Sequence, residues 1–134
     1  RVIMVGSMAA LSPGGAGHTL YPAAKSFVNK FALSLDAELR LKGIKVTCVN
    51  PGVTDTEFQI ANGTKDIMSG MPRFMRMSAE DVASQTLWAN DRGKVVFVPG
   101  WQNKIGAAFM RYLPDAVVVP IIRGAAEKYR KPED

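Results

Sequence analysis

Three short apolar runs, separated by two helical segments, constrain the fold of this chain more than any other feature. The runs cover residues 2–5, 44–49 and 94–98. Apolar runs of about four to eight residues with little polar alternation are typical of strands that are buried on both faces of a parallel sheet. The order strand, helix, strand, helix, strand therefore predicts an α/β fold, with a parallel sheet and helices on its faces.

The segment between the first two runs predicts one long helix over about residues 21–42. Pro22 suits its first turn, where a missing N–H removes no hydrogen bond, and Gly43 favours the left-handed backbone that commonly ends a helix. A second helix, over about residues 78–90, opens on Ser78, whose hydroxyl can cap it. Apolar residues at helical spacing give the long helix one apolar face. They are Ala24, Phe27, Val28, Phe31, Leu35 and Leu39.

The apolar tail after the third run predicts two further helices. One is short and ends before Pro114, and the other covers about residues 117–129, with a break at Pro120. We expect the tail to pack across the sheet or against a partner subunit. Contact of a basic amphipathic tail with a membrane surface is the alternative. Two turn-rich stretches, residues 12–17 and 55–77, lack clean periodicity.

Composition excludes several classes of function. The 17 basic and 12 acidic residues give a net charge of +5, but the basic residues are scattered, so we expect a solvated basic surface and no nucleic-acid partner. Cys48 and His18 are the only cysteine and the only histidine, so we expect neither an internal disulfide nor a metal site. No apolar stretch reaches the roughly 20 residues of a membrane span. We therefore expect a cytoplasmic protein with Cys48 buried in a strand.

Tyr21 and Lys25 stand four residues apart, so both side chains leave the same face of the predicted helix. A tyrosine is a weak general base at neutral pH, and a nearby ammonium group in a dry cleft favours its ionised form. The lysine could also donate hydrogen bonds to a sugar. The same spacing arises by chance in about one chain in four of this length, so the pair alone establishes no function.

Polar segments also follow the first two predicted strands. Ser7 ends the first strand, and N-P-G-V-T-D-T over residues 50–56 follows the second. The carboxyl ends of parallel strands share one edge of the sheet, where ligands gather. The long helix begins at that edge, after a glycine-rich loop. Ser7 and Tyr21 can therefore converge on one carbonyl oxygen, which the serine hydroxyl would position while the tyrosine exchanges the proton.

Together these motifs resemble those of the short-chain dehydrogenase/reductase family, of a bacterial type. The resemblance covers nearly all of residues 1–100 and implies the C-terminal half of a Rossmann-like doubly wound parallel sheet, with residues 101–134 as a helical tail. The matching elements are the strand-terminal Ser7, Y-P-A-A-K over residues 21–25, the segment 50–56, and residues 29–38 and 78–83. Residues 6–10 and 98–100 more loosely resemble a bacterial subgroup.

The resemblance implies an oxidoreductase that interconverts a carbonyl and an alcohol, with NAD or NADP as its cofactor. Tyr21 would be the acid/base, Ser7 would bind the substrate oxygen, and Lys25 would bind the nicotinamide ribose. The cofactor-binding residues it implies are Tyr21, Lys25, Pro51, Gly52, Val53, Thr54 and Thr56. The substrate would be a small molecule, lipophilic if the methionine-rich residues 58–77 line an apolar pocket, and the full-length protein would be a homo-oligomer.

The sequence departs from the family pattern in two ways. Ser7 precedes Tyr21 by fourteen positions, one more than the commonest family spacing, and the glycine-rich loop can absorb the extra residue. The family's phosphate-binding turn, ribose selector and catalytic asparagine lie upstream of the serine strand, so the choice between NAD and NADP is unreadable. We expect a fragment that lacks the dinucleotide-binding half and is inactive alone. The alternative is a non-catalytic assembly module that dimerises through the long helix.

Overall fold

The computed structural model describes residues 1–14, 20–55 and 72–129, with side chains described as far as residue 124. Its centre is a three-stranded parallel sheet in the order β1 (Val2–Val5), β2 (Val46–Val49) and β5 (Val96–Phe97). All four residues of β1 pair with β2, whereas β5 pairs with β2 at two positions. The predicted parallel sheet is confirmed, although the third strand is shorter than the predicted run.

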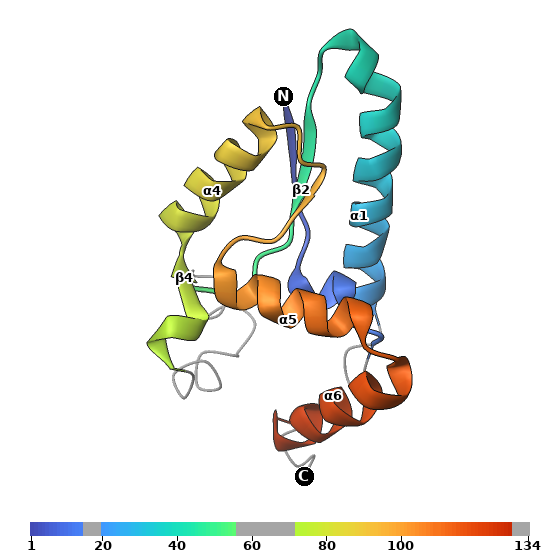
Figure 1. The fold of residues 1–134 in the computed structure, drawn as a ribbon, viewed down its shortest axis with the longest axis vertical. Helices are drawn as coiled ribbons and strands as arrows, with labels where there is room; N and C mark the ends of the chain where they lie inside the picture. The colour runs from blue at the N-terminus through green and yellow to red at the C-terminus, as the bar shows by residue number, and fades with distance from the viewer. Residues whose placement is uncertain (15–19, 56–71, 130–134) are drawn as a thin grey trace.

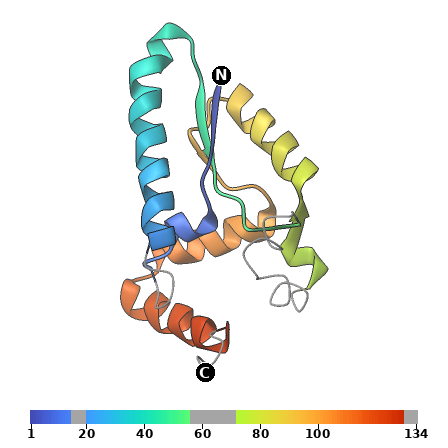
Figure 2. The same ribbon diagram turned by 180° about the vertical axis from the view of Figure 1, so that it is seen from behind.

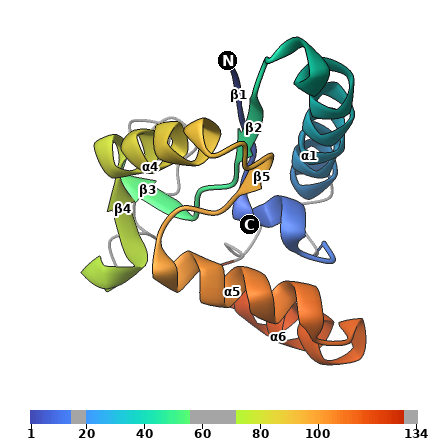
Figure 3. The ribbon, with the colours of Figure 1, turned by 45° about the horizontal axis from the view of Figure 1, so that its top comes forward.

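Two helices sandwich this sheet. Helix α1 (Leu20–Leu39) and helix α4 (Ala79–Asp91) lie on opposite faces, as Figures 1 and 3 show. The alternation of strands and helices is therefore as predicted. The remaining elements are η1 (Met8–Leu11), η2 (Arg40–Lys42), β3 (Val53–Asp55), η3 (Arg73–Met75), β4 (Arg76–Ser78), α5 (Trp101–Tyr112) and α6 (Asp115–Tyr129).

Strand β2 forms the middle of the core, because every one of its residues is buried. On the α1 side, Val46 and Cys48 pack with Ala32. On the α4 side, Val49 packs with Ala89 and with Phe97 of β5. The prediction that Cys48 is a buried strand residue is confirmed.

The prediction that the first strand is buried on both faces is wrong. Val2 and Met4 pack toward α1, but Ile3 and Val5 point to the other face, where Val5 is 62% exposed. Helix α4 packs on β2 and β5, so it does not reach β1. Within the described residues, no other element buries this face of β1.

The ends of the helices follow the expected capping chemistry. Gly43 adopts a left-handed φ of 72° just after η2, which ends the helical segment that α1 begins. Ser78 caps α4, since its Oγ accepts a hydrogen bond from the N–H of Asp81 (3.0 Å). The sequence therefore predicted the end of the first helical segment and the start of the second.

The tail and one of the turn-rich stretches differ from prediction. Pro120 lies inside α6 and does not break it, although its missing N–H removes one backbone hydrogen bond. Strands β3 and β4 pair in parallel as a separate two-stranded sheet, which was not predicted because three-residue strands carry too little periodicity. Among the described residues, no helix is long and apolar enough to cross a membrane.

The buried face of α1 is rotated away from its apolar stripe. The stripe residues Phe27 and Phe31 are 68% and 48% exposed, and their rings stack on each other with centroids 6.0 Å apart. At 100° per residue, the centre of the buried face is offset from the centre of the stripe by roughly 120°. Val28, Leu35 and Leu39, at the near edge of the stripe, still pack on the core. The helix residues that are buried are Pro22, Asn29, Ala32 and Asp36.

Candidate active site

Ser7 lies directly after β1, where the chain turns into η1. Its Oγ accepts a hydrogen bond from the N–H of Ala9 (3.2 Å) and so caps η1. Its own N–H donates to Oδ1 of Asn50 (2.9 Å), which ties Ser7 to the end of β2. A hydroxyl oxygen that accepts one hydrogen bond can still donate its proton. The Ser7 hydroxyl is therefore suited to donate to an oxygen of a ligand at this edge.

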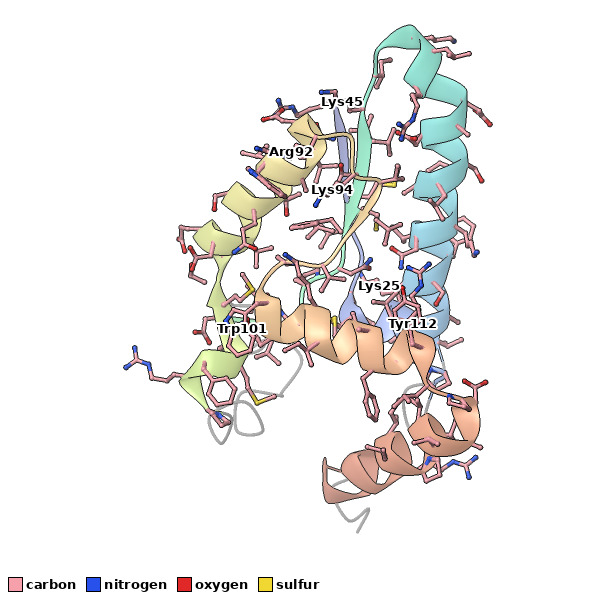
Figure 4. The ribbon with its side chains drawn as sticks, in the orientation of Figure 1. Lys25, Lys45, Arg92, Lys94, Trp101 and Tyr112 are labelled. Carbon is pink, nitrogen blue, oxygen red and sulfur yellow. The ribbon has the colours of Figure 1, made fainter. Side chains whose placement is uncertain are left out.

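Tyr21 and Lys25 project from the first turns of α1. Nζ of Lys25 lies 5.7 Å from the centroid of the Tyr21 ring, within the range of cation–π attraction. The same Nζ donates to the carbonyl oxygen of Val5 (3.1 Å), at the carboxyl end of β1, and Figure 4 shows Lys25 in this region. An ammonium group carries three donors, so this bond leaves two for a ligand. The Tyr21 side chain is exposed, which leaves its hydroxyl open to a ligand.

A buried pair of asparagines holds these elements together. Asn50 is fully buried, and its Nδ2 donates to Oδ1 of the buried Asn29 (2.9 Å), while its Oδ1 accepts the N–H of Ser7. One side chain thus joins the ends of β1 and β2 to α1. Neither asparagine was predicted as a catalytic or cofactor-binding residue. A signal was present, because Asn29 continues the four-residue spacing of Tyr21 and Lys25 on one helix face.

The carboxyl ends of β1 and β2 also approach each other closely through their backbones. Gly6 donates its N–H to the carbonyl oxygen of Val49 (2.7 Å), and Met8 donates to that of Pro51 (3.0 Å). A Cβ atom at Gly6 would overlap Oδ1 of Asn50. Only glycine therefore fits this position without displacing the buried asparagine.

The predicted cofactor rim leads from β2 into β3. Its residues from Pro51 to Thr54 are half-buried. Gly52 packs against the side-chain amide of Asn103 in α5, which a Cβ atom at this position would overlap. Asn103 is itself fixed by a hydrogen bond from Nδ2 to the carbonyl oxygen of Pro99 (2.9 Å). Thr56, the last predicted rim residue, lies outside the described residues.

Cys48 lies beneath this edge of the sheet, in the middle of β2. Burial raises the pKa of its thiol, against the smaller opposing effects of a hydrogen bond with the backbone of Gly6 and of the Lys25 charge. A buried neutral thiol is a poor nucleophile. Cys48 therefore packs the base of the site and offers no reactive group to a ligand.

Several known proteins are similar to this chain. The family described as short chain dehydrogenase matches residues 1–66. An uncharacterized oxidoreductase of Myxococcus xanthus (strain DK1622) is 29% identical over 117 residues, which are 87% of this chain and 42% of that protein. Serine 3-dehydrogenase of Agrobacterium fabrum (strain C58 / ATCC 33970) is 29% identical over 96 residues, covering 69% of this chain and 38% of that protein.

A solved structure is similar over almost the whole chain. It is a short-chain dehydrogenase from Sphingobium yanoikuyae in complex with NADPH, with a TM-score of 0.65 and 25% identity, and the match covers 98% of this chain and 46% of that one. The chain belongs to the short-chain dehydrogenase family and has its Rossmann-like α/β fold. It spans less than half the length of the relatives named here.

Proposed function

We propose that the whole protein is an oxidoreductase that interconverts a carbonyl and an alcohol by hydride transfer, with Tyr21 as its acid/base. The observation that carries this proposal is the hydrogen bond from Nζ of Lys25 to the carbonyl oxygen of Val5 (3.1 Å). It holds the helix face that bears Tyr21 at the carboxyl end of β1, two residues from Ser7. Membership of the short-chain dehydrogenase family supports the same reaction type.

Two side chains would act on the substrate oxygen, and a third would stabilise the charge that the reaction creates. The hydroxyl of Ser7 donates a hydrogen bond to the carbonyl oxygen and so orients the carbonyl group. The phenol of Tyr21 gives its proton to that oxygen during reduction, and takes the proton back during oxidation. The ammonium group of Lys25, 5.7 Å from the ring centroid, stabilises the negative charge that this transfer leaves on the tyrosine.

The residues present fit a nicotinamide dinucleotide, NAD or NADP, which supplies or accepts the hydride when it is bound. The two remaining donors of Lys25 suit the hydroxyl groups of a ribose. The half-buried segment from Pro51 to Thr54 follows β2 at the same edge of the sheet, where ligands bind in parallel α/β folds. The solved relative from Sphingobium yanoikuyae binds NADPH, which supports this cofactor class.

The proposed substrate is a small molecule with a carbonyl or an alcohol group. The name of one relative, serine 3-dehydrogenase, states oxidation of a hydroxylated substrate of this size. A lipophilic substrate would need an apolar pocket wall from residues 58–77, and most of that stretch lies outside the described residues.

The substitution Tyr21→Phe in the whole protein tests the proposed acid/base. We expect kcat to fall by about 100- to 10,000-fold, the usual contribution of a positioned proton donor. The affinity for NADH or NADPH, measured by fluorescence titration, should stay nearly unchanged, because the ring and Lys25 remain. The matched control is Ser34→Ala, which removes a hydroxyl from an exposed position of the same helix and should leave kcat unaltered. Turnover retained by Tyr21→Phe would remove the tyrosine from this role.

A second proposal concerns assembly, and the exposed aromatic pair on α1 supports it. Phe27 and Phe31, together with Leu20, leave an apolar helix face open to solvent. We propose that this face pairs with its copy in a homo-oligomer, because such pairing would bury both faces. Sedimentation velocity of a Phe27→Ser/Phe31→Ser variant tests this, with Leu41→Ser as a matched control at another exposed apolar position. An unchanged oligomeric state in the double variant would contradict the pairing.

A further inference from the structure

Helix α5 bears an exposed apolar stripe. Its four residues recur at spacings of four, four and three, which places them on one helix face. All four are exposed, Trp101 and Ile105 by 67% and 63%. The opposite face holds the buried Asn103, so the helix packs on the protein through its other side. The stripe consists of Trp101, Ile105, Phe109 and Tyr112.

The charges of α5 are all positive and lie along one flank of the stripe. Lys104 and Arg111 are seven residues apart, or about two helical turns, and the helix contains no aspartate or glutamate. Neither cation pairs with a carboxylate of the described residues. Nζ of Lys104 instead lies 5.5 Å from the ring centroid of Phe97, and Cζ of Arg111 lies 5.8 Å from that of Tyr112.

The helix lies across the molecule between the central sheet and α6. It crosses near the carboxyl end of the sheet and contacts η1 and η3, and Figures 1 and 2 show it on the side of the sheet away from the turn that follows α1, with α6 beyond it. Trp101 and Tyr112 stand at its two ends (Figure 4). The element η3, which contacts α5, also carries an exposed aromatic residue, Phe74.

We propose that the α5 stripe binds the surface of an anionic lipid bilayer, with the helix axis in the plane of the membrane. An amphipathic helix with large apolar side chains on one face and cations beside them is the usual form of an interfacial anchor. Tryptophan and tyrosine favour the depth of the lipid headgroups. Lys104 and Arg111 would meet the lipid phosphates from the flank of the stripe.

The charge pattern favours a bilayer over a second copy of the chain. Two stripes packed against each other would bring four cations and no carboxylate of α5 to one interface. Anionic headgroups would neutralise the same cations. This binding is independent of the proposed oxidoreductase activity, so vesicles test it without turnover.

Co-sedimentation of the 134-residue chain with vesicles tests the proposal. We expect binding to phosphatidylcholine vesicles that contain phosphatidylglycerol, weaker binding to pure phosphatidylcholine, and a loss of binding as salt screens the charges. Ile105→Glu should lower the partition coefficient by at least about tenfold, since it places a carboxylate in the middle of the stripe. Leu41→Glu is the matched control, with the same change at a side chain that is 97% exposed, far from α5. It should lower partitioning by less than about twofold.

Two further measurements keep the test decisive if Ile105→Glu unfolds, which far-UV circular dichroism would reveal. Lys104→Gln with Arg111→Gln should lower partitioning into anionic vesicles by roughly 25-fold, at about fivefold for each cation. Trp88→Phe leaves Trp101 as the only tryptophan, and its emission should shift to the blue on anionic vesicles. The proposal would be overturned if the chain bound neither the vesicles with phosphatidylglycerol nor those of pure phosphatidylcholine. Equal loss in Ile105→Glu and Leu41→Glu, or self-association that Ile105→Glu abolishes without any vesicle binding, would overturn it as well.

Discussion

Replacing Asn50 with alanine would remove the side chain that joins β1, β2 and α1. Asn50 is fully buried, accepts a hydrogen bond from the N–H of Ser7 and donates one to Oδ1 of Asn29, each of 2.9 Å. After the substitution both groups lose their partner. The loss of stability should therefore come mainly from the two polar groups left behind.

The magnitude follows from how far water can reach each group. A buried polar group without a partner costs about 1–3 kcal/mol. Ser7 is half-buried, so the cost of its N–H lies near the lower limit, whereas Asn29 is only 8% exposed and lies near the upper one. We expect the free energy of unfolding to fall by about 3–4 kcal/mol, a large part of the roughly 5–15 kcal/mol of a typical domain.

Urea unfolding of Asn29→Ala, Asn50→Ala and the double variant separates this explanation from simple loss of packing. Asn29→Ala removes the oxygen that Asn50→Ala leaves unpaired, so the double variant should be more stable than the sum of the single effects predicts, by about 1–2 kcal/mol. Asn29→Ala combined with Asn103→Ala serves as control, because no hydrogen bond joins these two side chains, and their effects should add within about 0.5 kcal/mol. Additivity of the first pair to within the same limit would refute the reasoning.

Three further results are expected. Gly6→Ala should destabilise the protein by about 2 kcal/mol or more, because its Cβ would overlap Oδ1 of Asn50. Gly124→Ala is the control, since a Cβ atom at this helix position meets no other atom, and it should not destabilise the protein. Thermal unfolding of the two variants measures the difference. Burial raises the pKa of Cys48, so its stabilising contribution is present below the thiol's ordinary range and is lost as pH rises through the raised value. The free energy of unfolding, measured in urea between about pH 8 and 10, should decline with pH, and Cys48→Ala should make this decline smaller. Equal pH slopes of the free energy in the two proteins would contradict the prediction. NADH and NADPH should bind the isolated chain with dissociation constants above about 1 mM, because the sequence contains no G-x-x-x-G-x-G turn. A lower dissociation constant in a fluorescence titration would contradict this prediction.

The order of strands and helices could be predicted from the sequence because it depends on local patterns. The apolar runs at residues 2–5 and 44–49 became β1 and β2, and the chemistry of Gly43 and Ser78 set the ends of the helices. These features require only propensity, periodicity and backbone geometry. The strand-terminal position of Ser7 followed in the same way.

Contacts between distant segments could not be predicted in this way. The hydrogen bond between Asn29 and Asn50 joins residues 21 positions apart, and hydrophobic periodicity contains no information about polar partners. The exposure of Val5 depends on the position of α4, which reaches β2 and β5 but leaves β1 open. Which helix covers which strand is a property of the assembled fold, and the pattern of a single strand does not contain it.

The proposed function would explain the rotated packing of α1. Tyr21, Lys25 and Asn29 recur every four residues on the helix face that meets the ends of the strands, where Lys25 bonds to β1 and Asn29 to the end of β2. A purely hydrophobic packing would turn the apolar stripe toward the sheet and carry this polar face away from Ser7. The structure therefore buries two hydrogen-bonded asparagines and leaves Phe27 and Phe31 in solvent. Local rules tend to fail at functional sites. Here the rule that fails is that the centre of the apolar stripe packs inward, and it fails on the helix that carries the proposed chemistry.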